Sequence, residues 1–246
     1  NFEKIFAKYL GVKFCLGVGS GTDALSISLK SLGIGIGDEV ITSSFTAYPT
    51  ITGIINSGAT PILVDINIEN ALMNYKAIEE KINEKTKAIL PVHLYGQCCD
   101  IHPIKEIANK YKLKIVEDCA QSTGATYKNR KAGTFGDIGA FSFYPTKNLG
   151  AYGDAGAITT DSEDLYLKAK LIRNYGQEDR YNHKLNGYNS RLDEIQAAIL
   201  STKLKYLDEW NKKRFKIASK YRKNLKNVNL LENNLYCEHV YHLFVV

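Results

Sequence analysis

The sequence predicts a three-layer α/β domain, in which a mainly parallel sheet lies between helices, followed by the start of a smaller α/β unit. Short β-branched apolar runs alternate with stretches whose apolar residues recur at i, i+3 and i+4, as in buried parallel strands and amphipathic helices. Repeated strand–helix–strand units of this kind are typical of α/β domains. Strands are expected at 39–42, 61–64, 88–92 and 113–116, and helices at 24–29, 49–57, 75–82 and 104–111.

The pattern changes after Asp118. Two short strands, at 140–144 and 156–160, are expected on either side of a glycine-rich loop. The run Ser190–Asp193 has the form of a capping box and predicts the start of a long amphipathic helix. We expect its buried face to carry Leu192, Ile195, Ile199, Leu207 and Trp210.

Both ends of the chain read as interrupted elements. The first residues form an amphipathic helical pattern without an initial Met, and 242–246 reads as a strand in progress. We therefore expect a fragment of a longer protein, with a large domain at 1–208 and the start of a truncated C-terminal domain at 209–246.

Composition narrows the class of protein. The chain has 246 residues, of which 44% are hydrophobic and 24% charged, as is ordinary for a globular protein with a full core. The net charge of +6 is concentrated at 203–226, where interleaved Asp208 and Glu209 favour a solvated helix face over a nucleic-acid patch. No apolar run reaches the length of about 18 residues that a membrane span requires. The dispersed cysteines favour reduced thiols and a cytoplasmic setting.

Metal binding has little support in the sequence. His239 and His242 are three residues apart, but no Cys or carboxylate ligands accompany them, so we expect no metal site.

A phosphate site is indicated by Gly19-Ser20-Gly21-Thr22 immediately before a helix. Small residues allow close approach of the backbone, and the free N–H groups and dipole of a helix N-terminus favour an anion. Glycine-rich turns also occur without a ligand. The run is not a Walker A loop, because no Lys follows the last glycine.

Asp118 ends a strand-like run, where sites in open α/β sheets lie. A buried carboxylate there can keep a pyridine nitrogen protonated, although an Asp in this position can also be a helix cap or a metal ligand. Lys147 follows the apolar run 140–144 and precedes a glycine-rich loop, a setting that favours a desolvated amine suited to Schiff-base formation. Ser142 offers a hydroxyl to a phosphate. Asn189, beside a helix start, is a candidate phosphate ligand only in company with these residues.

These features resemble the DegT/StrS family of sugar aminotransferases, which have fold type I of the pyridoxal-5′-phosphate (PLP) enzymes. The resemblance extends through nearly the whole chain. It rests on the motifs GSGTDAL (19–25), GDEVI (37–41), EDCAQS (117–122), FSFYPTKNLG (141–150), GDAGAI (153–158) and GYNSRLDE (187–194).

The resemblance implies a role for each site residue. Lys147 would carry PLP as a Schiff base and move protons. Asp118 would pair with the pyridinium nitrogen, and Gln121 would lie against the ring near its hydroxyl. Asn189 would reach the phosphate of the neighbouring subunit's cofactor, so that a homodimer is needed for activity. The cofactor's phosphate would be bound by Ser20, Gly21, Thr22 and Ser142.

One position departs from the family pattern. Many relatives have an aromatic residue on the ring face just after the Thr that corresponds to Thr46, whereas Ala47 and then Tyr48 follow here. Either Tyr48 or another side chain covers the ring, or the stacking is weaker.

The implied reaction moves an amino group from glutamate to a nucleotide-linked keto sugar. Several motifs are most similar to the branch that acts at C3 of dTDP-3-keto-6-deoxyhexoses, for surface polysaccharide or glycoside biosynthesis; a C4 aminotransferase of a UDP- or dTDP-linked sugar is the alternative. The motifs similar to the C3 branch are HLYGQ (93–97), KNLGAYGD (147–154), NYGQ (174–177) and LDEWN (207–211).

Three other functions fit the sequence less well. A PLP-dependent sugar dehydratase of the same fold would have His in place of Lys147. A non-enzymatic relative would be expected to have lost Lys147 or Asp118. A dinucleotide-binding module would need an acidic ribose ligand about 20 residues after the glycines, and only Glu39 is loosely in range.

Overall fold

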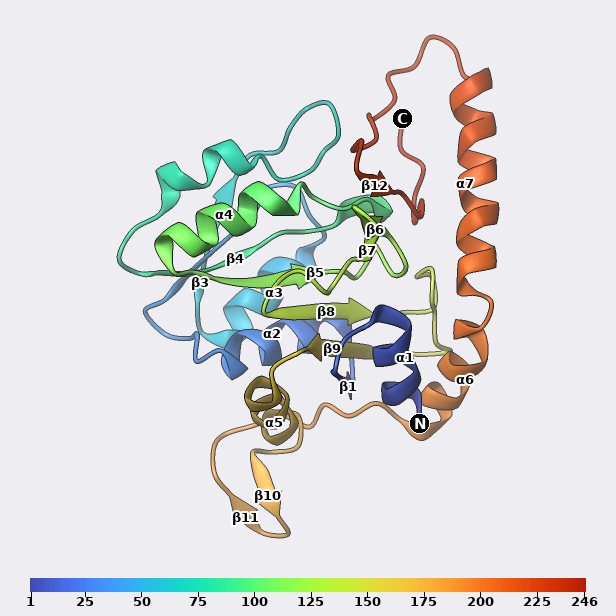
Figure 1. Ribbon diagram of the computed structural model, residues 1–246. Helices are drawn as coiled ribbons and strands as arrows, with labels where there is room; N and C mark the ends of the chain where they lie inside the picture. Colours follow the sequence, from blue (N-terminus) through green and yellow to red (C-terminus); the bar gives the residue numbers. More distant parts are fainter.

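The computed structural model describes residues 1–246 and is built around one seven-stranded sheet (Figure 1). The strand order is β1-β9-β8-β5-β4-β2-β3. Neighbours from β8 to β3 are parallel, whereas β9 runs antiparallel to both β8 and β1. The strands are β1 (Phe14–Val18), β2 (Glu39–Ser43), β3 (Thr60–Val64), β4 (Thr86–Leu90), β5 (Lys114–Asp118), β8 (Ile138–Ser142) and β9 (Gly156–Thr160).

Helices cover both faces of the sheet, as Figure 1 shows for α3 and α4. The chain moves from β2 outward to β3 through α3, but from β4 in the opposite direction to β5 through α4. Because such crossovers are right-handed, the two helices lie on opposite faces. The helices are α1 (Phe2–Leu10), α2 (Gly21–Ser31), α3 (Tyr48–Ser57), α4 (Ile101–Tyr111), α5 (Glu163–Ile172), α6 (Glu194–Leu204) and α7 (Leu207–Asn224). The predicted α/β fold is therefore confirmed.

Small elements complete the fold at the rims of the sheet. Three 3₁₀ helices, a hairpin and a second sheet of order β12-β6-β7 are formed outside the main sheet. They are η1 (Tyr75–Ala77), η2 (Glu79–Lys81), η3 (Leu94–Gly96), β6 (Thr126–Tyr127), β7 (Arg130–Lys131), β10 (Gln177–Asp179), β11 (Asn182–His183) and β12 (Cys237–Glu238). No helix combines the length and the apolar character needed to cross a membrane.

Two predicted helices are wrong in detail. The segment 75–82 forms η1 and η2 instead of an α-helix, because Ile78 is fully buried between them and each turn closes by an i→i+3 bond. The long helix predicted after Ser190 is two helices, α6 and α7. Ile195 on its expected inner face is 74% exposed.

The predicted helix start at Ser190 and the predicted strand at 242–246 are also wrong. Ser190 does not cap a helix, since its hydroxyl accepts from Gly19 N at 2.9 Å and donates to Asp23 Oδ2 at 2.8 Å; Asp193 is the N-cap of α6. The run 242–246 forms no strand, because no neighbouring strand pairs with it.

Candidate active site

A cavity of about 320 Å³ opens at the carboxyl ends of β5 and β8. Sites of open α/β sheets lie at this edge, where the chain changes direction between neighbouring strands. Seven of the eight residues predicted for the site line the cavity: Ser20, Gly21, Thr22, Asp118, Gln121, Ser142 and Lys147. Asn189 does not. It is exposed and forms an isolated bridge with Asn174.

One end of the cavity is the N-terminus of α2. Ser20 is the N-cap, and its hydroxyl accepts from Asp23 N at 3.1 Å. The backbone N–H groups of Gly21 and Thr22 form no hydrogen bond within the chain. A Cβ at Gly21 would lie 2.5 Å from Ser142 Cβ, so only glycine lets the two segments meet here. Free N–H groups, the helix dipole and nearby hydroxyls make this end suitable for a phosphate.

Asp118 is a second polar group that lines the cavity and is 5% exposed. Its Oδ1 accepts from Ala120 N at 3.0 Å and its Oδ2 from Thr50 Oγ1 at 2.8 Å. Burial raises the pKa of Asp118, while these bonds and the charge of Lys147 oppose the rise. Such a carboxylate gains most from a positively charged hydrogen-bond donor.

A buried pair lies behind Asp118. His93 Nε2 is 2.9 Å from Glu117 Oε2, and both side chains are fully buried. Glu117 also accepts from Gly133 N, Phe135 N and Gly136 N at 2.7 to 2.9 Å. Backbone bonds from His93 N to Asp118 O, at 3.0 Å, and from Asp118 N to Pro91 O, at 2.9 Å, fix the end of β5 against the chain beyond β4.

The His93 imidazole is neutral. Cys99 N donates to His93 Nδ1 at 3.1 Å, which requires that nitrogen to be unprotonated, so the single proton lies on Nε2 and is donated to Glu117. Cys119 is the third member of this cluster, whose ligand atoms lie within 4.8 Å of one another. Because the carboxylate of Glu117 already accepts four hydrogen bonds, the cluster serves to hold the strand ends rather than a metal ion.

Lys147 lies in the loop between β8 and β9, and its amine forms no hydrogen bond or ion pair. Burial lowers the pKa of Lys147, and the charge of Asp118 partly offsets that change. The next residue anchors the loop: Asn148 Nδ2 donates to Asn211 Oδ1 at 2.8 Å and to Val240 O at 3.0 Å. The amine is thus held in a confined place and kept easy to deprotonate.

Gln121 lies on the wall of the cavity. Its Oε1 accepts from Tyr95 N at 2.7 Å, which leaves its amide N–H groups free to donate. Tyr95 has φ of 59°, an unusual value for a bulky residue, so this bond comes from a strained turn.

The segment 46–49, between β2 and the first turn of α3, contributes no aromatic side chain to the cavity. Tyr48 is 77% exposed and does not line the cavity, whereas Thr46, Ala47 and Pro49 do. Tyr144 is the aromatic residue of the lining. Val92 and Ala120 supply apolar surface.

Sequence reasoning missed Thr50. Its hydroxyl is 2.7 Å from Thr46 Oγ1 and donates to Asp118, and it is 1% exposed. A hydroxyl on the inner face of a predicted amphipathic helix was the available signal, because such a group must find a buried partner.

His239 and His242 do not form a metal site with a third ligand. The His239 ring stacks on Tyr241 with centroids 3.8 Å apart, and burial lowers its pKa to about 3. Burial, aided by the charges of Lys147 and Arg214, lowers the pKa of His242 to about 4.

Comparison with known proteins gives relatives along the whole chain. A transaminase of Aneurinibacillus thermoaerophilus, dTDP-3-amino-3,6-dideoxy-alpha-D-galactopyranose transaminase, is 50% identical over 248 residues, covering 100% of this chain and 68% of that protein. The structure of DesV from S. venezuelae in complex with a ketimine intermediate matches with a TM-score of 0.96 at 42% identity. That match covers 99% of this chain and 66% of DesV, so the chain spans about two thirds of the length of its relatives.

A third match concerns the cofactor. The structure of NtdA from Bacillus subtilis with bound cofactor PMP has a TM-score of 0.92 and 41% identity, covering 99% of this chain and 57% of NtdA. The model of the DegT/DnrJ/EryC1/StrS aminotransferase family matches residues 1–246. With this match and relatives of such identity, the chain belongs to the DegT/DnrJ/EryC1/StrS aminotransferase family.

Proposed function

We propose that this protein is a PLP-dependent aminotransferase that moves an amino group from glutamate to the C3 keto group of a dTDP-linked 6-deoxyhexose. The observation that carries the proposal is that Asp118 and Lys147, a buried carboxylate and an unpaired amine of lowered pKa, share one cavity with the N-terminus of α2. The sugar is inferred from the 50% identical relative, whose name specifies a dTDP-3-amino-3,6-dideoxy sugar.

The donor set of the cavity fits PLP. Its phosphate matches the free N–H groups of Gly21 and Thr22 and the Ser142 hydroxyl, which lines the same cavity. The pyridine nitrogen matches Asp118, and the ring hydroxyl matches the free amide N–H groups of Gln121. When bound, PLP supplies an electron sink that makes the α-proton of an amino acid acidic.

The chain's own residues then have distinct tasks. Lys147 Nζ would take up the proton that the substrate carbon loses, for which an amine of lowered pKa is suited. Asp118 would keep a proton at the pyridine nitrogen, and Thr50 and Ala120 hold the carboxylate in place. In a two-stage reaction glutamate delivers the nitrogen first and the keto sugar accepts it second.

The quaternary arrangement is part of the proposal. Asn189 is exposed and lies outside the cavity of its own chain, as expected for a residue that reaches the cofactor phosphate in the neighbouring subunit of a homodimer. We further propose that 1–208 is the large cofactor-binding domain and that 209–246 begins the small domain. The proposed boundary falls in the first turn of α7.

The direct test is the visible absorption spectrum of the protein with PLP, recorded before and after glutamate is added. We expect a band that depends on Lys147 and bleaches with glutamate; Lys147→Ala should lack it, while Lys203→Ala, whose lysine lies outside the cavity, should keep it. A band unaffected by glutamate would contradict the proposed reaction. Incubation of the bleached enzyme with 3-keto and 4-keto sugars would then identify the acceptor, because only the C3 proposal predicts a 3-amino product by NMR.

A further inference from the structure

Two cysteines far apart in the sequence meet beside the C-terminal segment. Cys98 follows η3 and Cys237 begins β12, yet Cys98 N donates to Cys237 Sγ at 3.0 Å. Both residues are free thiols. Cysteines that seemed dispersed in the sequence thus form a pair in the fold.

The backbone around the pair keeps the two sulfurs together. Asn234 N donates to Gln97 Oε1 at 2.8 Å, and Asn234 Nδ2 donates to Cys98 O at 3.1 Å. Cys237 is also in register with Tyr127 on β6. Val240 N donates to Gly96 O at 2.9 Å, so the two segments are joined on both sides of the sulfurs.

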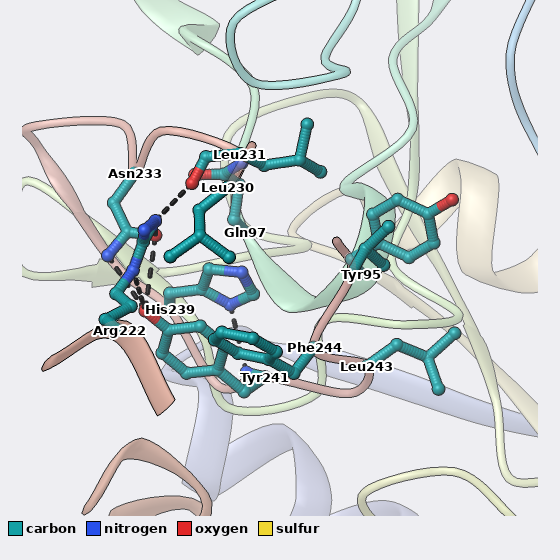
Figure 2. Close-up of a pocket in the computed structure, with 11 residues that line it drawn as sticks. Tyr95, Gln97, Arg222, Leu230, Leu231, Asn233, His239, Tyr241, Leu243 and Phe244 are labelled. Carbon is teal, nitrogen blue, oxygen red and sulfur yellow. Dashed lines mark hydrogen bonds between the residues drawn. The ribbon is translucent and has the colours of Figure 1, made fainter. Parts of the chain in front are cut away.

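The same two segments enclose a small cavity of about 20 Å³. Figure 2 shows that Gln97, Arg222, Asn233 and Tyr241 surround it and come from three parts of the chain. Asn233 Nδ2 donates to Tyr241 Oη at 2.9 Å, and Gln97 Nε2 donates to Glu232 O at 3.3 Å. Hydrogen bonds and packing alone hold the C-terminal segment here.

The chemistry of the pair is asymmetric. The neighbouring Cys98 thiol and the Cys98 backbone N–H, which donates to Cys237 Sγ at 3.0 Å, lower the pKa of Cys237, while the neighbouring Cys237 and burial raise the pKa of Cys98. Cys237 is partly exposed, whereas Cys98 is 1% exposed. Cys237 is thus the accessible nucleophile, and Cys98 is the adjacent thiol that can react with it after oxidation, as in redox-active cysteine pairs.

We propose that Cys98 and Cys237 form a redox-sensitive pair, which hydrogen peroxide converts to a disulfide that ties the C-terminal segment to the loop after η3. The Cys237 thiolate attacks a peroxide oxygen and breaks the O–O bond, giving a sulfenic acid and a hydroxide that takes up a proton to form water. The Cys98 sulfur then displaces the second hydroxide, which leaves as water with the proton of the Cys98 thiol. Two thiols lose two electrons and two protons, and one peroxide becomes two waters.

The disulfide would act on a segment close to the candidate active site. Val240 N donates to Gly96 O at 2.9 Å, and Tyr95 N donates to Gln121 on the cavity wall. A covalent link between residues 139 positions apart also restricts the unfolded chain. Oxidised protein should therefore melt several degrees higher than reduced protein, by about 4 °C or more.

The test is oxidation of the intact protein with hydrogen peroxide, followed by peptide mass spectrometry without reductant. We expect loss of two thiols per chain and one cross-linked peptide that contains Cys98 and Cys237, reversed by reduced glutathione. In Cys98→Ser, Cys237 should instead be trapped as sulfenic acid by dimedone. Cys15→Ser is the matched control, since Cys15 is buried away from the pair, and it should form the disulfide at the wild-type rate.

Three results would overturn the proposal. The first is a cross-link that uses other cysteines. The second is that Cys98 in Cys237→Ser reacts with peroxide as fast as Cys237 does in Cys98→Ser. The third is that no cross-link forms in the wild type at peroxide concentrations that oxidise Cys237 in Cys98→Ser. Cys237→Ala provides a second variant if Cys237→Ser does not fold. The readout is a bond within the chain and requires neither PLP nor turnover, so the result does not depend on the proposed aminotransferase activity.

Discussion

Thr50 Oγ1 donates a 2.8 Å hydrogen bond to Asp118 Oδ2 and so joins helix α3 to the end of β5. The bond favours the ionised carboxylate, which burial disfavours. Its removal in Thr50→Val should raise the pKa of Asp118 further and cost about 1.5–3 kcal/mol of interaction with a charged group. We expect PLP to bind about tenfold more weakly or worse, measured by absorption titration. Thr50→Ser keeps the hydroxyl and should bind as wild type; equal affinities of the two variants would show that the bond has no role.

The amine of Lys147 should titrate below an ordinary lysine in the absence of PLP. Burial lowers its pKa, and the negative charge of Asp118 raises it in part. Asp118→Asn removes the opposing charge, so the pKa should fall further and the neutral amine should persist to lower pH. The pH dependence of Lys147 labelling by acetic anhydride, read by mass spectrometry, measures both values. A higher pKa in Asp118→Asn would mean that the two groups do not interact as described.

The buried Glu117 should contribute strongly to stability. Its hydrogen bonds, led by the one from His93, outweigh the effect of burial and lower its pKa, so its contribution is present near neutral pH and is lost as pH falls through that lowered pKa. Glu117→Gln places amide N–H groups against backbone N–H donors. We expect the free energy of unfolding in urea near pH 7 to fall by about 1–3 kcal/mol for each buried donor left unpaired, and by less at acid pH.

The control for Glu117 is Glu79, which forms an exposed ion pair with Lys110 at 2.7 Å. Glu79→Gln should cost about 0–1 kcal/mol, because water and salt screen exposed pairs. Equal losses for the two variants would contradict the role assigned to the buried pair.

Six of the seven strands and most of the cavity could be predicted because their signals are local; the strand β1 was not predicted. The strand 156–160 was predicted with the bounds that the structure has, since a short apolar run between glycines has few alternatives. Asp118 ends β5 and Lys147 follows β8, and both strands end at one edge of the sheet, so the proximity of the two residues follows from the fold class.

The remaining features depend on tertiary contacts that a local pattern does not contain. Ser190 has the sequence of a cap, but its partners Gly19 and Asp23 are about 170 positions away. The break between α6 and α7 has no Gly or Pro to mark it; it lies between the buried Leu204 and Leu207, which face the core.

Mixed dimers would test the proposed role of Asn189. Lys147→Ala should inactivate the site of its own chain, whereas Asn189→Glu should inactivate the partner's site by placing a negative charge near the phosphate. A hybrid of the two variants would then contain one site with both wild-type residues. If the variants are coexpressed and assort at random, about one quarter of wild-type activity should return from two inactive parents. If Asn189 acted within its own chain, every site in the hybrid would lack one residue, and the mixture would be as inactive as its parents. The measurement therefore decides between a shared and an unshared site. A purely structural defect in Asn189→Glu would remain in every hybrid dimer, and a Lys147→Ala partner would not restore one quarter of the activity.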